Sequence, residues 1–182
     1  SDADAEALTA TDLSALGGKT AGTVTVTNAV AITGSNSEVT AALVTGGTKV
    51  EVSDATVTIN DADAEALTAT SLSAIGGATD GTVTVTNAVA ITGSDSEVTA
   101  ALVTGGTLVE VSDATVTITG NPSISDLNAI AAKTDGVVTT TLAAASLAAL
   151  GALNTAATDV ITVTVSDADA EALTATDLSA LG

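Results

Sequence analysis

The sequence contains no Cys, His, Met, Phe, Trp or Tyr, and its only basic residues are Lys19, Lys49 and Lys133. Without Cys and His it has no thiol nucleophile, no Ser–His catalytic triad and no zinc site of the ordinary type. Without aromatic rings it offers no platform on which nucleic-acid bases or sugars stack. Its 22 acidic residues give a formal charge of −19, so we expect no nucleic-acid partner.

Three small residue types dominate what is present, with 38 Ala, 35 Thr and 21 Val among 182 residues. The hydrophobic content of 46% separates the chain from disordered acidic tails, which are poor in aliphatic residues. A core built only from Val, Ile, Leu and Ala lacks the large buried areas that aromatic side chains supply. Such a core fills a narrow space more easily than a wide one, which predicts a thin, elongated architecture.

No apolar run approaches the roughly 18 residues that a membrane span requires, so we expect no direct membrane insertion. No signal peptide is visible at the start of the sequence. The sequence begins at Ser1 inside a repeat and ends at Gly182 inside another copy of it. We therefore expect this chain to be a segment of a longer protein.

Internal repetition is the strongest signal in the sequence. Residues 1–59 and 60–118 align without gaps and are identical at 52 of 59 positions. A diverged stretch covers residues 119–165, and residues 166–182 then reproduce residues 1–17 without a change. We interpret these as two repeat units, a diverged unit and the start of the next unit, all within one continuous segment.

A shorter period runs through all of these units. The segment Thr23-Val24-Thr25-Val26-Thr27 alternates as a half-buried strand does, and related runs recur along the chain. The marker residues Val24, Val50, Val83, Val109, Val138 and Val163 are separated by 26, 33, 26, 29 and 25 residues. Spacings of this size fit one coil of a solenoid.

Each coil also carries turn and helix signals. An Asn-Ala or Asp-Ala corner follows the strand and leads into a second alternating run. Ser35 and Glu38 form a capping-box pattern before an apolar stretch, and Ser94 and Glu97 repeat it. Residues 1–4 form a weaker pattern of this kind, which predicts a helix beginning at Ala5 with acidic groups near its positive end.

Together these patterns predict a right-handed parallel β-solenoid of about six coils, with short helices on one side of the coils. Val and Ile should point inward, and Thr, Ser, Glu and Lys outward, with each coil contacting only its neighbours. A three-sided all-β helix is the structural alternative, although the Ala-rich patches favour some helix. A compact globular α/β domain is less favoured, because near-identical tandem units rarely build one.

One motif recurs beyond the 59-residue duplication. Residues 12–16 read Asp-Leu-Ser-Ala-Leu and are followed by Thr20 and Gly22-Thr23-Val24; residues 126–130 and their sequel repeat this pattern. The pattern resembles repeats in very large secreted surface proteins of cyanobacteria and other marine bacteria, which are adhesin-like or tied to surface layers and motility. The resemblance implies an extracellular, cell-surface location and a structural or adhesive role, and it carries over no catalytic residues.

The acidic clusters are the candidate metal sites, because carboxylate oxygens are the ligands that Ca²⁺ prefers. The alternative is that they cap helices and form a solvated acidic face, and this interpretation is favoured. Neither an EF-hand loop nor the Gly-rich nonapeptide of calcium β-rolls is present. The candidate calcium ligands are Asp2, Asp4, Asp61, Asp63, Asp167 and Asp169.

The sequence bears on two other activities, ice binding and catalysis. The Thr-x-Thr runs at residues 23–27 and 82–86 suggest ice binding by a regular array of Thr side chains. The intervening coil, however, should place Lys49, Glu51 and Ser53 on the same face, and the charged side chains interrupt that array. An enzyme is not expected, because the acidic residues repeat with the units whereas an active site is usually unique. The Gly pairs also lack the Lys-Ser/Thr sequel of a phosphate-binding loop.

The sequence therefore predicts a structural repeat segment, a scaffold, stalk or filament, of a large secreted bacterial surface protein that self-assembles or adheres. Open strand edges make self-association, or contact with neighbouring repeats of the same chain, the expected partnership. The acidic surface opposes side-by-side contact unless divalent cations screen it. The alternative function is an ice-binding or calcium-dependent ligand-binding solenoid module.

Overall fold

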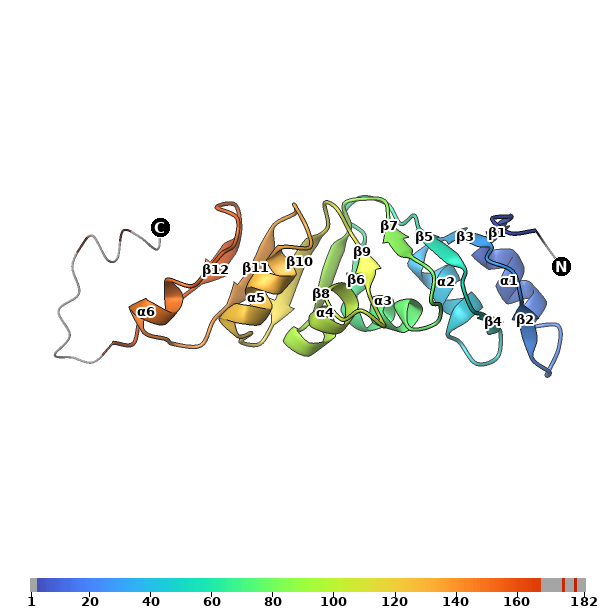
Figure 1. Ribbon diagram of the computed structural model, residues 1–182, viewed down its shortest axis with the longest axis horizontal. Helices are drawn as coiled ribbons and strands as arrows, with labels where there is room; N and C mark the ends of the chain where they lie inside the picture. The colour runs from blue at the N-terminus through green and yellow to red at the C-terminus, as the bar shows by residue number, and fades with distance from the viewer. Residues whose placement is uncertain (1–2, 168–174, 176–178, 180–182) are drawn as a thin grey trace.

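The structure is a computed structural model that describes residues 3–167, Ala175 and Ser179. Helices and strands follow one another along a rod, with β1 and α1 at one end and α6 and β12 at the other (Figure 1). The apolar core runs through this rod as one cluster of Val, Ile, Leu and Ala side chains. The elongated shape predicted from the lack of aromatic residues is therefore present.

Helices divide the described chain into successive layers. Six helices occur in residues 3–167: α1 (Ala10–Gly17), α2 (Asn36–Leu43), α3 (Ala69–Gly76), α4 (Asp95–Leu102), α5 (Ile124–Ala131) and α6 (Leu147–Leu150). We call the stretch from the start of one helix to the residue before the next a layer. Layers 1 to 5 are residues 10–35, 36–68, 69–94, 95–123 and 124–146, and layer 6 begins at residue 147.

The strands lie in three sheets, and every pairing between them is parallel. The first five-stranded sheet has the order β1 (Ala7–Thr9), β3 (Ala31–Gly34), β5 (Thr56–Ile59), β7 (Val83–Val85), β9 (Val109–Glu110). The second has the order β12 (Val160–Thr162), β11 (Val138–Thr141), β10 (Thr115–Thr119), β8 (Ala90–Ser94), β6 (Ala66–Thr68). A two-stranded sheet pairs β2 (Val24–Val26) with β4 (Val50–Val52).

These sheets follow the layers closely. After β1, which precedes layer 1, layers 1 to 4 each add one strand to the first five-stranded sheet, and layers 2 to 6 each add one strand to the second. The part of the chain that is described is thus an α/β fold of parallel strands with interspersed helices, and its sheets do not close into a barrel. Parallel strands need such crossovers, because a tight hairpin cannot join them.

The strand registers confirm which side chains point inward. In the first sheet Val57 lies beside Val83, and Ile59 lies beside Val85. All four are at most 2% exposed, whereas the Thr residues between them face outward. The alternation read from the sequence therefore places Val and Ile in the core.

The helix starts confirm both predicted capping boxes. The Ser35 side chain accepts a hydrogen bond from the backbone N–H of Glu38, and the Glu38 carboxylate accepts one from the backbone N–H of Ser35. Ser94 and Glu97 form the same pair of hydrogen bonds. These pairs satisfy amides that have no partner inside a helix.

The prediction of a helix beginning at Ala5 was wrong. Ala5 has φ of 60° and the matching Ala64 has 62°, a left-handed conformation that interrupts a helix. The chain instead turns there and forms β1, and α1 begins after Thr9, whose hydroxyl accepts the Asp12 N–H. A third strand in layer 2, β6, follows the equivalent turn and was also missed.

Candidate functional site

The acidic turn at residues 61–65 closes a layer onto its own helix. The Oδ2 atom of Asp61 accepts the N–H of Asn36, the first residue of α2, at 2.6 Å. The Oδ2 atom of Asp167 accepts the N–H of Leu147, the first residue of α6, at 2.9 Å. Helix N-termini carry unpaired amides and partial positive charge, so a carboxylate there is favourable. The same acidic position therefore caps a helix in two different layers.

The acidic turn also reaches the following layer. The Oδ1 atom of Asp63 accepts the N–H of Ala88 at 3.0 Å, and the Asn87 side chain donates to the Asp61 carbonyl at 2.6 Å. The Ala64 N–H donates to the Ala88 carbonyl at 2.8 Å. The acidic turn thus links layer 2 to layer 3 through hydrogen bonds made by its side chains and its backbone.

The structure places the candidate calcium ligands as follows. Asp61, Asp63 and Asp167 accept backbone amides, and Asp4 lies exposed on the first acidic turn. Asp2 and Asp169 lie outside the described residues. Within residues 3–167 no three metal-ligating side chains gather into a group that could hold a metal ion. The hydrogen bonds support the capping interpretation, and calcium binding stays a prediction.

A truncation at Asp61 separates the two interpretations. Asp61→Ala removes the acceptor for the Asn36 amide, and we expect it to lower the free energy of unfolding by about 1 kcal/mol, as loss of a helix cap does. The loss should be the same in chelator and in millimolar Ca²⁺, measured by urea unfolding. Asp80→Ala, at an exposed carboxyl outside the acidic clusters, is the control and should change little. A rise in stability with Ca²⁺ in the wild type that disappears in Asp61→Ala would instead establish a calcium site.

Glutamates at the capping boxes link neighbouring layers in a second way. The Thr11 hydroxyl of α1 donates to Glu38 of α2 at 2.9 Å, and Thr70 of α3 donates to Glu97 of α4 at 2.7 Å. The Ser35 backbone N–H, with help from Thr11 and the Ser35 hydroxyl, lowers the pKa of Glu38. The Ser94 N–H, with Thr70 and the Ser94 hydroxyl, lowers the pKa of Glu97 in the same way. Both carboxylates are thereby held ionised while they connect two helices.

The junction between α4 and α5 carries a buried carboxylate oxygen that has no hydrogen-bond partner among the described residues. At the earlier junction, between α2 and α3, the Ser71 hydroxyl donates to Asn36 Oδ1 at 2.9 Å. Asp95 occupies the position of Asn36 in the second unit, and its Oδ1 atom is buried without a hydrogen-bond partner among the described residues. Burial raises the pKa of Asp95 above its ordinary value, and the nearby charge of Asp126 raises it further. The sequence signal for this site is that Asn36 of the first unit is replaced by Asp95 in the second.

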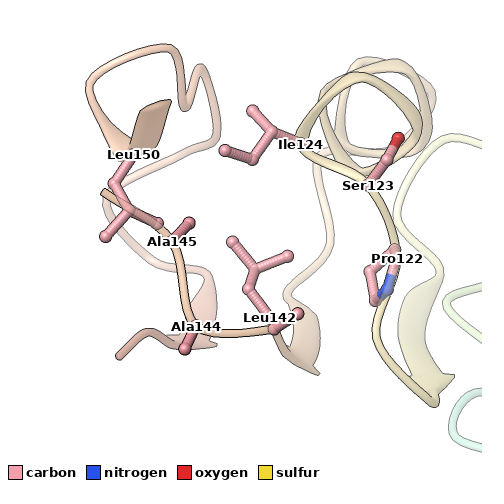
Figure 2. A pocket seen from close by; sticks show the side chains of 8 residues that line it. Pro122, Ser123, Ile124, Leu142, Ala144, Ala145 and Leu150 are labelled. Carbon is pink, nitrogen blue, oxygen red and sulfur yellow. The ribbon is translucent and has the colours of Figure 1, made fainter. Parts of the chain in front are cut away.

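An apolar hollow of about 160 Å³ lies between the start of α5 and the residues that follow β11. Figure 2 shows Ile124 and Leu142 pointing toward it, with Leu150 of α6 on the far side. Its polar group is the hydroxyl of Ser123, which already donates to Asp126 at 2.6 Å as the cap of α5. The hollow is lined by Pro122, Ser123, Ile124, Leu142, Ala143, Ala144, Ala145 and Leu150.

Threonine side chains form outward columns along the two five-stranded sheets. The predicted interruption of the Thr-x-Thr run is confirmed, because Glu51 lies beside Thr25 and Glu110 beside Thr84. Along the sheets, however, Thr residues stand beside one another in four successive strands. The first column is Thr9, Thr33, Thr58 and Thr84, and the second is Thr68, Thr92, Thr117 and Thr139.

In comparisons with known proteins, no family model, curated protein or solved structure matches the chain. None of the helices in the described part of the chain is long and apolar enough to cross a membrane.

Proposed function

We propose that the chain is a right-handed parallel β-solenoid of six coils, and that it serves as a structural repeat segment of a large secreted bacterial surface protein. In this role it is a scaffold or stalk whose length is set by the number of repeats, and its partners are further repeats of the same kind. It performs no chemistry of its own.

One observation carries this proposal. The first five-stranded sheet takes β1 and then one strand from each of layers 1 to 4, and the second takes one strand from each of layers 2 to 6, so contacts run from layer to neighbouring layer along the rod. An arrangement of this kind extends by adding units without changing the existing contacts. A spacer needs to be extendable in this way. An active site, which is built once in a fold, does not need it.

The hydrogen bonds of the acidic residues support the same role. The carboxylates of Asp61, Asp63 and Asp167 accept hydrogen bonds from backbone amides. The carboxylate of Glu38 in α2 accepts the Thr11 hydroxyl of α1 and so joins the two helices. The recurring motif, which resembles repeats of secreted surface proteins, reads Asp-Leu in α1 and α5 and Ser-Leu in α3, and it buries Leu13, Leu72 and Leu127. The motif on which the resemblance depends therefore holds layers together.

Solution scattering on chains of different length tests the proposal. We expect chains with one, two and three extra copies of residues 60–118 to grow in maximum dimension by a constant increment, at an unchanged cross-sectional radius. A chain that grows equally in all directions would contradict the scaffold role. Expression in a bacterium that displays such proteins, followed by surface labelling, tests the extracellular location separately.

Ice binding is the second candidate function. The two Thr columns support it better than the Thr-x-Thr runs from which it was predicted. Regularly spaced hydroxyl and methyl groups on a flat sheet can order water. Each column is one residue wide and ends at Glu110 or Val160. Freezing hysteresis of the wild type, with Thr58→Lys as the control, distinguishes this function from a scaffold, which shows none.

A further inference from the structure

The second Thr column, on β6, β8, β10 and β11, has a neighbour on the same sheet. Two residues further along the strands, Thr119 of β10 lies beside Ser94 of β8, and Thr141 of β11 lies beside Thr162 of β12. The register of β10 and β11 brings Thr119 beside Thr141. These four residues form a third column of hydroxyl side chains, directly beside the second.

The second and third columns together repeat in two directions. The strands β8, β10, β11 and β12 follow one another along the rod (Figure 1). Neighbouring strands lie about 4.8 Å apart, and alternate residues of one parallel strand lie about 6.6 Å apart. Thr115, two residues before Thr117 on β10, extends the pattern by one more position. We define the Thr array as Thr92, Thr115, Thr117, Thr119, Thr139, Thr141 and Thr162.

The hydroxyls of the Thr array are not used inside the molecule. None of the seven forms a side-chain hydrogen bond with another described residue. By contrast, Thr68 and Ser94, which lie in the same columns, cap α3 and α4. Six of the seven residues are exposed, and Thr139 is partly buried. The array therefore presents hydroxyl groups that can bond to an external partner.

This sheet also differs from the other two in charge. Its five strands contain no charged residue, although the chain carries 22 acidic residues. In the first sheet Glu110 lies beside Thr84, and in the two-stranded sheet Glu51 lies beside Thr25. The second sheet is thus the one whose hydroxyl array is free of interrupting charges.

The Thr pattern of this face persists where the 59-residue repeat does not. Thr139, Thr141 and Thr162 lie in the diverged stretch, residues 119–165. Thr119 stands where the first unit is followed by Asn60. The array is therefore not a by-product of the duplication, because half of it lies outside the duplicated units.

The Thr array lies along the side of the rod. Strands pair with one another along the rod, and their outward side chains stand roughly perpendicular to the sheet. Further layers stacked on either end of the rod would leave this face open. It is a surface of the stacked layers themselves.

We infer that the Thr array is an ice-binding face. The water molecules of an ice surface repeat in two directions, so a single column of hydroxyls cannot match them and a two-dimensional array can. Thr is β-branched and stiff at χ1, so its hydroxyl and methyl groups keep their spacing at little cost in entropy. This inference rests on ice binding, the second candidate function above, and assigns it to one sheet.

Lys substitutions on the two five-stranded sheets test this assignment in the full chain. Thr117→Lys and Thr141→Lys each place a charge in the Thr array, one in each column, and should abolish freezing hysteresis. Thr58→Lys makes the same change of charge on the first sheet and should retain the wild-type value. All three side chains point outward from their strands, so thermal unfolding should stay close to that of the wild type.

Freezing hysteresis at matched protein concentration measures the outcome, and the fraction of labelled protein taken up by slowly growing ice is a second readout. The inference requires the wild type and Thr58→Lys to enter the ice and both array variants to be excluded from it. A wild type without hysteresis would overturn the inference together with ice binding. Loss of activity in Thr58→Lys, or full activity in either array variant, would overturn only the assignment to this face. The scattering test of the scaffold role is independent of all these results.

Discussion

Replacing Gly81 by Ala is expected to lower the free energy of unfolding by about 3 kcal/mol, because the new methyl group overlaps main-chain atoms in a close-packed contact. The Cβ would meet the carbonyl groups of Ala55 and Asp54, which belong to the preceding layer. Neither can move alone, because the Ala55 carbonyl also accepts the Thr79 hydroxyl and the neighbouring strands β5 and β7 are paired.

The internal repeat provides the control for this change. Gly22→Ala alters the same repeat position with the same side chain, and no layer lies against it within one copy. We expect its free energy of unfolding to stay within about 0.5 kcal/mol of the wild type, as for an ordinary surface substitution. Urea unfolding followed by circular dichroism, at concentrations where the chain is monomeric, compares the two. Equal stability of both variants would contradict the close contact between layers 2 and 3.

The loss of stability caused by Gly81→Ala should also be confined to the layers near the mutated contact. Each layer contacts mainly its neighbours, so stability is approximately a sum of layer and interface contributions. Hydrogen exchange in Gly81→Ala should therefore quicken first in β5 and β7, while β11 near the far end keeps its protection. Uniform loss of protection along the whole rod would instead indicate one cooperative unit.

Much of this architecture follows from local patterns in the sequence. The Thr-Val alternation specifies strands such as β2 and β7, and Ser35 with Glu38 specifies the start of α2, because these signals depend only on adjacent residues. Repetition at 26 to 33 residues then indicates parallel pairing between layers. The order of strands in the sheets agrees with that expectation.

The acidic turns show where local patterns stop being sufficient. Asp2 to Ala5 resembles a helix start, yet the matching Ala64 adopts a left-handed conformation because the turn must bring its N–H to the Ala88 carbonyl of the next layer. The strand β6 that follows has only three residues, too few for a periodic signal. Both features are fixed by contacts about 25 residues away along the chain, which no local window contains.

The contacts of the acidic residues at the candidate site could likewise not be predicted from local sequence patterns. That Asp61 would meet the first amide of α2 depends on the chain completing one layer between them. The sequence identified the acidic clusters as the polar feature to explain and named capping as one interpretation. It could not show which amide each carboxylate reaches, because that depends on how layers stack.

Replacing Asp95 by Asn is expected to raise the free energy of unfolding by about 1.5 kcal/mol, because it removes an unpaired charge from a partly buried position. The Asn side chain also supplies N–H donors that can face the Asp126 carboxylate, as an ion of the same charge cannot. Part of the gain is offset, since a carboxylate at the first position of α4 interacts favourably with the helix N-terminus.

The pH dependence follows from the raised pKa of Asp95, which burial causes first and the charge of Asp126 second. A carboxyl whose folded-state pKa is raised binds its proton more tightly in the folded chain than in the unfolded one. It therefore destabilises the fold while ionised at neutral pH, and this cost disappears as pH falls through the raised pKa toward the ordinary value. The advantage of Asp95→Asn over the wild type should be largest at neutral pH and shrink across that acidic window.

A set of matched variants assigns this effect to the junction between α4 and α5. Asp80→Asn makes the same charge change at an exposed carboxyl and should leave stability nearly unchanged. In an Asp126→Asn background, Asp95→Asn should gain less, because the opposing charge is already gone, and a double-mutant cycle measures that coupling. An equal gain in both backgrounds would mean that burial alone destabilises Asp95. A loss of stability in Asp95→Asn at neutral pH would mean that its interaction with the helix N-terminus outweighs both effects.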